Sequence, residues 1–236
     1  MKKENDNKKV NTQKKTGEKD GKKTVEVVFI LDRSGSMSGL EKDTIGGFNS
    51  MLKRQKDEGN DIIWSTVLFD HEISTVHDRL PLDKVNPLDE RTYYVRGTTA
   101  LLDATGETIK RIGIAHKYAR PEVRPDRTLV VITTDGLENA STRYDASEVR
   151  RMIGKEKEKY GWEFIFLGAD IEAEAVAGSM GIDRSRAARY HNDSEGIGLN
   201  YQAVSEITVG LAKEGIVCET CLESVRADYK SRSKKR

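Results

Sequence analysis

The sequence is poor in cysteine, proline and aromatic residues, and it has no long apolar run. Its 236 residues include two cysteines and four prolines, and 6% of them are aromatic. A transmembrane helix needs about 20 mostly apolar residues in a row, so no membrane span is expected. The first 23 residues also lack the apolar core of a secretory signal peptide. Cys218 and Cys221 cannot build a disulfide scaffold, so we expect a reducing, cytoplasmic location.

Charged residues are abundant but unevenly distributed. Residues 1–23 carry nine Lys and four Asp or Glu, and residues 226–236 carry six Lys or Arg and one Asp. Residues 24–225 hold 25 basic and 34 acidic side chains, so the formal net charge of +1 combines an acidic body with two basic ends. An acidic body disfavours a nucleic-acid-binding face on the fold itself, which leaves the basic tails as the segments able to contact phosphate.

The composition divides the chain into three parts. Residues 1–23 contain two apolar residues and no aromatic residue, so they cannot bury enough surface to offset the entropy of ordering. We expect residues 1–23 to be a disordered basic tail and residues 24–215 to form one domain. Residues 216–236 are expected to form a basic extension that is mobile at its end.

Apolar runs bounded by turn residues predict strands that alternate with helices. Residues 25–31 and 128–134 are almost continuously apolar, as in strands buried on both faces of a parallel sheet. Further strands are expected at 61–69, 73–80, 162–168 and 187–191, the first two paired as an antiparallel hairpin. One helix is expected to begin after a capping box formed by Ser38 and Glu41. Further helices are expected at 101–118, 144–160, 171–180 and 195–213. This alternation predicts an α/β sandwich with a mostly parallel sheet.

Three loops of this sheet carry hydroxyl and carboxylate groups, and functional residues collect at the carboxyl ends of parallel strands. The first loop, with Asp32, Ser34 and Ser36, directly follows the first buried strand. The second spans residues 96–104 at a helix start, and the third, residues 133–136, follows the second buried strand. Carboxylates and hydroxyls without His or Cys suit Mg²⁺ or Mn²⁺, with Ca²⁺ less favoured, rather than Zn²⁺.

The spacing within the first loop favours a common centre. In a tight turn, alternate residues can direct short side chains toward one point, so Asp32, Ser34 and Ser36 can converge. Gly35 lets the backbone bend closely there. Asp32 and Asp135, from the first and third loops, would together give a divalent ion two carboxylates. The resulting site is nearly neutral, which favours one further anionic oxygen from outside the chain.

The segments VVFILDRSGSMSGL, GTTALLDA and VVITTDG resemble, in this order, the three motif loops of the von Willebrand factor type A (vWA) domain with its metal-ion-dependent adhesion site (MIDAS). The resemblance covers about residues 24–213 and is strongest to cytoplasmic single-domain members from bacteria and phages. It implies a three-layer Rossmann-like fold, with a six-stranded sheet of order 3-2-1-4-5-6, one antiparallel edge strand and helices on both faces. Arg96 departs from the pattern, because many members have Gly before the position of Gly97.

The resemblance also implies a ligand set and a function. In this family, a Glu or Asp of a partner protein commonly completes the coordination of the metal. The sequence therefore predicts a metal-dependent protein-binding module, with Arg96 and Arg143 able to guide the partner's carboxylate if they lie on the rim. The implied ligands of Mg²⁺ or Mn²⁺ are the hydroxyls of Ser34 and Ser36, the carboxylates of Asp32 and Asp135 directly or through water, and the hydroxyl of Thr99, with Thr98 as the adjacent alternative.

Other interpretations stay open at this point. Asp32 and Asp135 are also typical turn or helix-capping residues. A regulatory subunit that lends its site to a separate ATPase or chelatase would have the same sequence features. A Mg²⁺-dependent aspartyl phosphotransferase would need a second Asp where this chain has Ser34, and no phosphate-binding Gly-rich loop occurs, so an enzyme is less favoured. Cys218 and Cys221 could form half a zinc site or a redox motif, but an idle reduced pair is favoured.

Overall fold

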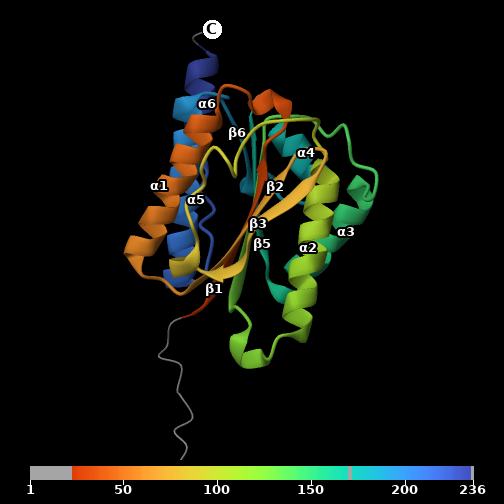
Figure 1. The fold of residues 1–236 in the computed structure, drawn as a ribbon, viewed down its shortest axis with the longest axis vertical. Coiled ribbons are helices and arrows are strands. Elements are labelled where there is room, and N and C mark those ends of the chain that lie inside the picture. Colours follow the sequence, from red (N-terminus) through yellow and green to blue (C-terminus); the bar gives the residue numbers. More distant parts are fainter. Residues whose placement is uncertain (1–22, 170–171, 235–236) are drawn as a thin grey trace, which may run out of the picture.

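The computed structural model describes residues 23–169 and 172–234. A six-stranded sheet forms its centre, in the order β3-β2-β1-β4-β5-β6 (Figure 1). Neighbouring strands run parallel except β3, which pairs antiparallel with β2 at one edge. This order and the antiparallel edge strand confirm the predicted fold. The strands are β1 (Val25–Asp32), β2 (Ile62–Phe69), β3 (Ile73–Pro81), β4 (Arg127–Thr134), β5 (Glu163–Ala169) and β6 (Ala187–Tyr190).

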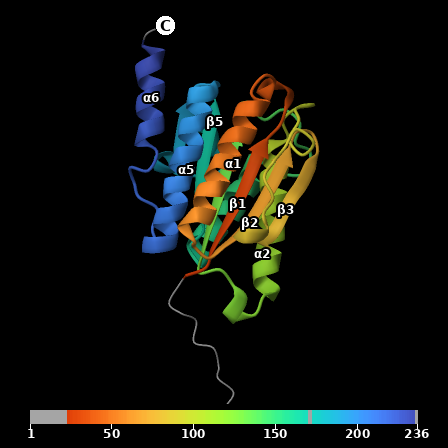
Figure 2. The same ribbon diagram turned by 60° about the vertical axis from the view of Figure 1, so that its left-hand side comes forward.

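Helices cover both faces of the sheet. In the two ribbon views, α1 and α5 lie together on one face, and α2 and α3 lie with α4 on the other (Figure 1, Figure 2). No helix within the described part of the chain is long and apolar enough to cross a membrane. The helices are α1 (Glu41–Glu58), α2 (Leu101–Tyr118), α3 (Ala146–Tyr160), α4 (Ala173–Ser179), α5 (Ser194–Glu214) and α6 (Glu223–Ser233).

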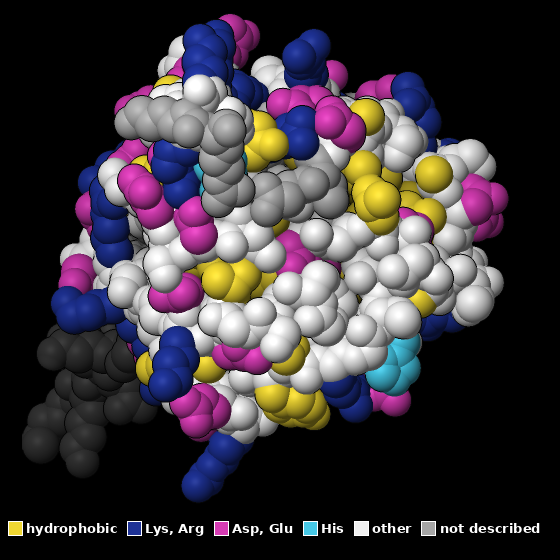
Figure 3. All heavy atoms as spheres, turned by 90° about the horizontal axis from the view of Figure 1, so that it is seen from above, with side chains coloured by type: hydrophobic (Ala, Val, Ile, Leu, Met, Phe, Trp, Pro, Cys, Tyr) yellow, Lys and Arg dark blue, Asp and Glu magenta, His cyan; other side chains and the backbone are white. Residues whose placement is uncertain are grey.

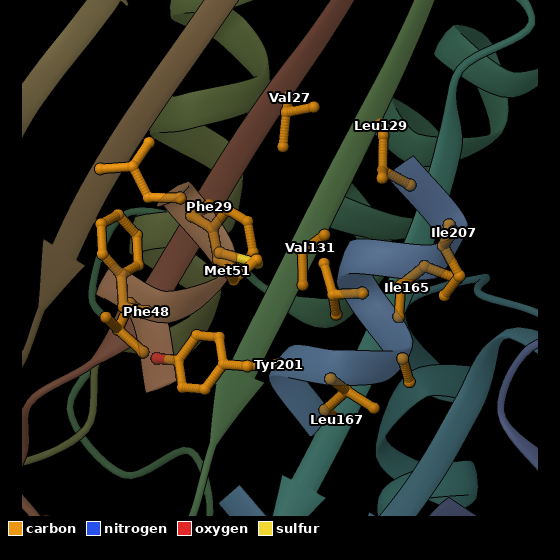
Figure 4. Packing of buried hydrophobic residues seen from close by; sticks show 14 of the residues in the cluster. Val27, Phe29, Phe48, Met51, Leu129, Val131, Ile165, Leu167, Tyr201 and Ile207 are labelled. Carbon is orange, nitrogen blue, oxygen red and sulfur yellow. The ribbon is translucent and has the colours of Figure 1, made fainter. Parts of the chain in front are cut away.

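Both faces of the sheet are buried, which explains the almost continuous apolar character of its central strands. In β1, successive residues point to opposite faces, so Phe29 packs with α1 and α5 while Ile30 packs with the helices of the other face. The ring centroids of Phe48 and Trp64 lie 5.8 and 5.3 Å from that of Phe29. Figure 4 shows Phe29 and Phe48 beside Tyr201 of α5. This packing fixes the strand whose end carries the first predicted loop.

The start of α1 differs from the prediction. The capping box from Ser38 to Glu41 is wrong, because α1 begins at Glu41 with Leu40 at the N-cap position and no side chain caps it. A short 3-10 turn over Gly35–Met37 and a residue in the left-handed conformation, Gly39, connect β1 to this helix. The Glu41 carboxylate instead accepts a hydrogen bond from the Gly39 N–H at 2.8 Å.

Helix α6 is absent from the predicted elements. The last predicted helix ends at residue 213, whereas the structure has a further helix packed on α5 and β6. Val225 is buried in α6, and so is Leu222 at its N-cap position, but charged residues surround them, so the weak pattern is easily taken for a solvated tail. The predicted N-terminal tail lies outside the described residues apart from Lys23, as do residues 235–236, so mobility of both ends stays a prediction.

Candidate metal centre

The three predicted loops lie together at the end of the sheet where the parallel strands finish. Backbone hydrogen bonds join the first two loops: the Gly35 N–H donates to the Gly97 carbonyl at 3.1 Å, and the Arg96 N–H donates to the Arg33 carbonyl at 2.9 Å. Gly97 has a positive φ of 66°, and a Cβ there would meet the His71 ring at 2.0 Å, so this close approach requires glycine. Figure 3 looks onto this end of the molecule, where Lys and Arg side chains lie mostly around the margin.

Asp32, the last residue of β1, is completely buried. Its Oδ1 accepts a hydrogen bond from the Ser34 N–H at 2.7 Å, and its Oδ2 accepts one from the Thr134 hydroxyl at 2.6 Å. These donors are neutral, and no Lys, Arg or His among the described residues forms an ion pair with it. Burial is the main reason that the pKa of Asp32 rises from 3.8 to about 6. A carboxylate in such a place ionises at a cost unless a cation lies beside it.

The hydroxyls of the first loop connect this buried carboxylate with the third loop. Ser34 Oγ lies 3.1 Å from Ser36 Oγ, and the Ser36 hydroxyl donates to Asp135 Oδ1 at 2.5 Å. Ser34 is buried and Ser36 is exposed, so the row of oxygens runs from the interior to the surface. Repulsion from Asp135 also contributes, as a smaller cause than burial, to the raised pKa of Asp32. The structure thus brings four of the five predicted residues together.

The fifth predicted residue, Thr99, lies close to Gly136. A Cβ at Gly136 would lie 2.8 Å from Thr99 Oγ1 and 3.4 Å from Ser36 Oγ, so these two hydroxyls converge on the same small volume. Thr99 is buried, whereas Thr98 is exposed. Of the two neighbouring threonines, Thr99 is therefore the one whose hydroxyl lies with the other candidate ligands.

Two residues that directly follow the third loop, Glu138 and Asn139, hold the second loop in place, and they are not among the predicted site residues. Asn139 Oδ1 accepts from the Thr99 N–H at 2.9 Å, and the Asn139 N–H donates to the Thr99 carbonyl at 3.1 Å. The Glu138 carboxylate accepts from the N–H groups of Leu102 and Ser141 at 2.8 and 2.7 Å. The only available signal was the acid and amide pair that follows the Thr-Thr-Asp-Gly motif.

Asp103 in the first turn of α2 has a structural role rather than a role as a candidate ligand. Its carboxylate accepts hydrogen bonds from the N–H groups of Thr142, Arg143 and Tyr144 at 2.9–3.0 Å. Burial alone would raise the pKa of Asp103, but these three donors hold it below its usual value. The Arg143 side chain lies 3.5 Å from both Asp103 and Glu107, so its charge is already paired. Asp103 joins α2 to the loop after β4 rather than contributing to the centre.

A second buried carboxylate, Asp70, follows the end of β2, next to β1. Arg33 and Arg96 each donate an Nε–H to Asp70 Oδ2 at 2.8 Å. Arg96 also pairs with Glu72. Arg96 and Arg143 thus both pair with carboxylates of this chain, and their role in guiding a partner's carboxylate stays a prediction.

The candidate centre offers a metal ion only carboxylate and hydroxyl oxygens from the described side chains. Within residues 23–169 and 172–234, no group of three or more His, Cys, Asp and Glu side chains is arranged to hold a metal ion. A cation at this end of the sheet would therefore depend on two carboxylates together with hydroxyl groups, and these are oxygen ligands of the kind that Mg²⁺ and Mn²⁺ accept. The buried Asp32 and the space beside Gly136 fit such an ion. Cys218 and Cys221 are free thiols far along the chain from these loops.

Comparison with known proteins gives a result at the level of structure. No family model matches the chain, and no curated protein matches it. The vWF domain of the type V pili tip protein Mfa5 from Porphyromonas gingivalis is similar with a TM-score of 0.58 and 12% identity, over 84% of this chain and 99% of that chain. The von Willebrand factor type A protein from Catenulispora acidiphila gives a TM-score of 0.51 and 14% identity, over 80% of this chain.

A third solved structure is proximal thread matrix protein 1 from the mussel byssus, with a zinc-occupied MIDAS motif. Its TM-score is 0.53, with 15% identity over 79% of this chain. This chain spans 46% of the mussel protein and 43% of the Catenulispora protein. At these identities the likeness establishes the fold alone. The chain has the fold of a vWA domain, as the resemblance of its three motif loops implied.

Proposed function

We propose that this chain is a metal-dependent protein-binding module. The observation that carries the proposal is the environment of Asp32, a fully buried carboxylate whose hydrogen-bond donors are all neutral. Burying such a charge costs several kcal/mol unless an opposite charge offsets it. The proposed ligands of a Mg²⁺ or Mn²⁺ ion are Asp32, Ser34, Ser36, Thr99 and Asp135, and a Glu or Asp of a partner protein would complete the coordination.

The five residues contribute different properties to this site. A bound divalent ion supplies positive charge and an electrophilic position for an oxygen of the partner. Asp32 and Asp135 contribute negative charge, while Ser34, Ser36 and Thr99 contribute neutral oxygens. This balance leaves the site able to accept one more carboxylate. Ser36 is exposed and Asp135 is partly exposed, so the side of the site that they form is the one a partner can reach.

The ion is proposed to be Mg²⁺ or Mn²⁺ because no His or Cys belongs to the ligand set. The MIDAS motif of the mussel protein holds zinc in its solved structure, which supports a divalent ion in this fold without favouring Mg²⁺. The two free cysteines are consistent with the proposed cytoplasmic setting.

A binding role is favoured over phosphoryl transfer by the same carboxylate. An aspartyl nucleophile has to be reached by the phosphate group of its substrate, whereas Asp32 is completely buried, and Ser34 stands where such an enzyme needs a second Asp. Mg²⁺-dependent hydrolysis of a generic phosphate ester, abolished by Asp32→Asn, would support the enzyme instead. A regulatory subunit of an ATPase or chelatase would use the same site, and the identity of the captured partner distinguishes it from a free-standing adaptor.

The metal site is tested by calorimetric titration with Mn²⁺ and Mg²⁺. The double variant Asp32→Ala/Ser34→Ala should lose binding, and Ser38→Ala, an exposed serine of the same loop, serves as the matched control. A double variant that binds as tightly as the parent would show that the site is misplaced. Partner binding is tested by affinity capture from a bacterial lysate, repeated with EDTA and with Asp135→Ala. A partner retained in both controls would place the contact elsewhere.

A further inference from the structure

Helix α6 packs along the edge strand β6 and reaches the end of the sheet that carries the candidate metal centre (Figure 1, Figure 2). Near the start of α6, the Arg226 guanidinium donates to the backbone carbonyls of Arg184, Ser185 and Ala187 at 2.9–3.1 Å. These contacts attach the first turns of α6 beside the start of β6. The helix then runs alongside the strand toward its carboxyl end.

The last turns of α6 contact the loop that joins β6 to α5. The rings of Tyr229 and His191 stack with their centroids 4.5 Å apart, and His191 Nε2 lies 3.2 Å from the Tyr229 carbonyl oxygen. One residue beyond Asn192, Asp193 Oδ2 accepts a hydrogen bond from Arg232 at 2.6 Å. The residues on both sides of Asn192 are therefore fixed by α6.

The same loop contacts the candidate metal centre. Asn192 donates its Nδ2–H to Asp135 Oδ2 at 3.0 Å, while Ser36 donates to Asp135 Oδ1 at 2.5 Å. The two oxygens of this carboxylate are thus each directed by a side chain from a different loop. The start of α5 packs closely against the β6–α5 loop, because a Cβ at Gly196 would lie 2.1 Å from the His191 carbonyl oxygen.

We propose that Asn192 is a positioning residue for Asp135, and that α6 holds Asn192 in place through His191 and Asp193. The inference rests on the proposed function, in which Asp135 is a metal ligand. The C-terminal helix then sets the affinity of the site for a divalent ion without contacting that ion. Residues that orient metal ligands typically change metal affinity 10- to 100-fold when they are replaced.

The test compares variants of the full chain by calorimetric titration with Mn²⁺. Asn192→Ala should weaken binding roughly tenfold, and Arg232→Ala, which removes one contact of α6 with the loop, should weaken it by a smaller factor. Lys230→Ala changes an exposed residue of the same helix and should leave the affinity unchanged. If Arg232→Ala does not fold, Arg232→Lys replaces it, since Lys keeps the charge but loses the planar guanidinium.

A second readout, independent of metal, is amide hydrogen exchange of residues 133–139 in EDTA. Faster exchange is expected in Asn192→Ala and Arg232→Ala but not in Lys230→Ala, because Asp135 loses its orientation. Parental Mn²⁺ affinity in the first two variants would overturn the inference. If the parent itself binds no Mn²⁺, the proposed function fails, and exchange then decides: faster exchange supports the positioning role, and unchanged exchange overturns it.

Discussion

Asp32 and Asp70 stand at comparable positions, at the ends of two neighbouring parallel strands, yet their surroundings are different. Both side chains are completely buried. Asp70 meets the guanidinium groups of Arg33 and Arg96 at 2.8 Å, whereas Asp32 meets only neutral N–H and hydroxyl donors. The chain thus supplies cations to one carboxylate and, within the described residues, none to the other. An external cation therefore has the most to contribute at Asp32.

The largest effect is expected from removing the charge of Asp70. In Asp70→Asn, two arginines would face a neutral amide, and breaking a buried ion pair from one side typically costs about 3–5 kcal/mol. We expect the free energy of unfolding in urea, measured without metal at pH 7, to fall by about this amount. Asp32→Asn is the matched comparison, and it should cost little, because the carboxylate it removes has no cation. Equal losses in the two variants would contradict the distinction.

The pH dependence of stability sharpens the comparison. Burial raises the pKa of Asp32 from 3.8 to about 6, so between these pH values the folded protein holds a proton that the unfolded chain has released. The contribution of Asp32 to stability therefore decreases as the pH rises through this window, by roughly 2–3 kcal/mol for a shift of about two pKa units. The free energy of unfolding of the parent relative to Asp32→Asn should fall accordingly in EDTA. Parallel pH profiles for the two proteins would contradict the assignment.

Local patterns explain which parts of the fold were predictable. Helix α2 begins at Leu101 and ends at Tyr118 as predicted, because loops on both sides and a regular apolar spacing mark its limits. The start of α1 depends on how Gly39 turns the chain, which the Ser38–Glu41 spacing does not encode. Helix α6 depends on hydrogen bonds from Arg226 to carbonyls about 40 residues away, so no local pattern identifies it.

The candidate site shows the same division. Asp32, Ser34 and Asp135 could be proposed because they lie at or just after the ends of buried strands, and strand ends are readable from the sequence. The partners that orient the site join distant residues: Asn139 bonds to Thr99, and Asn192 bonds to Asp135 from 57 positions away. The internal cations of Asp70 are likewise invisible to spacing, since they come from two different loops.

A smaller effect is expected from a pair of neighbouring threonines on the Asp32 side of the comparison. Thr99→Ala removes the hydroxyl that would lie 2.8 Å from a Cβ added at Gly136, so we expect Mn²⁺ affinity to fall by at least the roughly tenfold loss typical of residues that only orient a ligand. Thr98→Ala removes an exposed hydroxyl and is the control with unchanged affinity. Thr99→Ser keeps the oxygen and should retain most of the binding. If Thr98→Ala loses affinity instead, the ligand from the second loop is Thr98 rather than Thr99.

The smallest effect is expected on the Asp70 side, from the loss of one of its two arginines. The Arg33 side chain is buried, whereas that of Arg96 is partly exposed. Arg96→Ala leaves Asp70 with Arg33, and an ion pair that water can reach contributes little. The urea midpoint should therefore shift much less than in Asp70→Asn, and Mn²⁺ affinity should stay unchanged. Similar losses in the two variants would contradict this expectation, because they would mean that the buried Arg33 alone does not stabilise the Asp70 carboxylate.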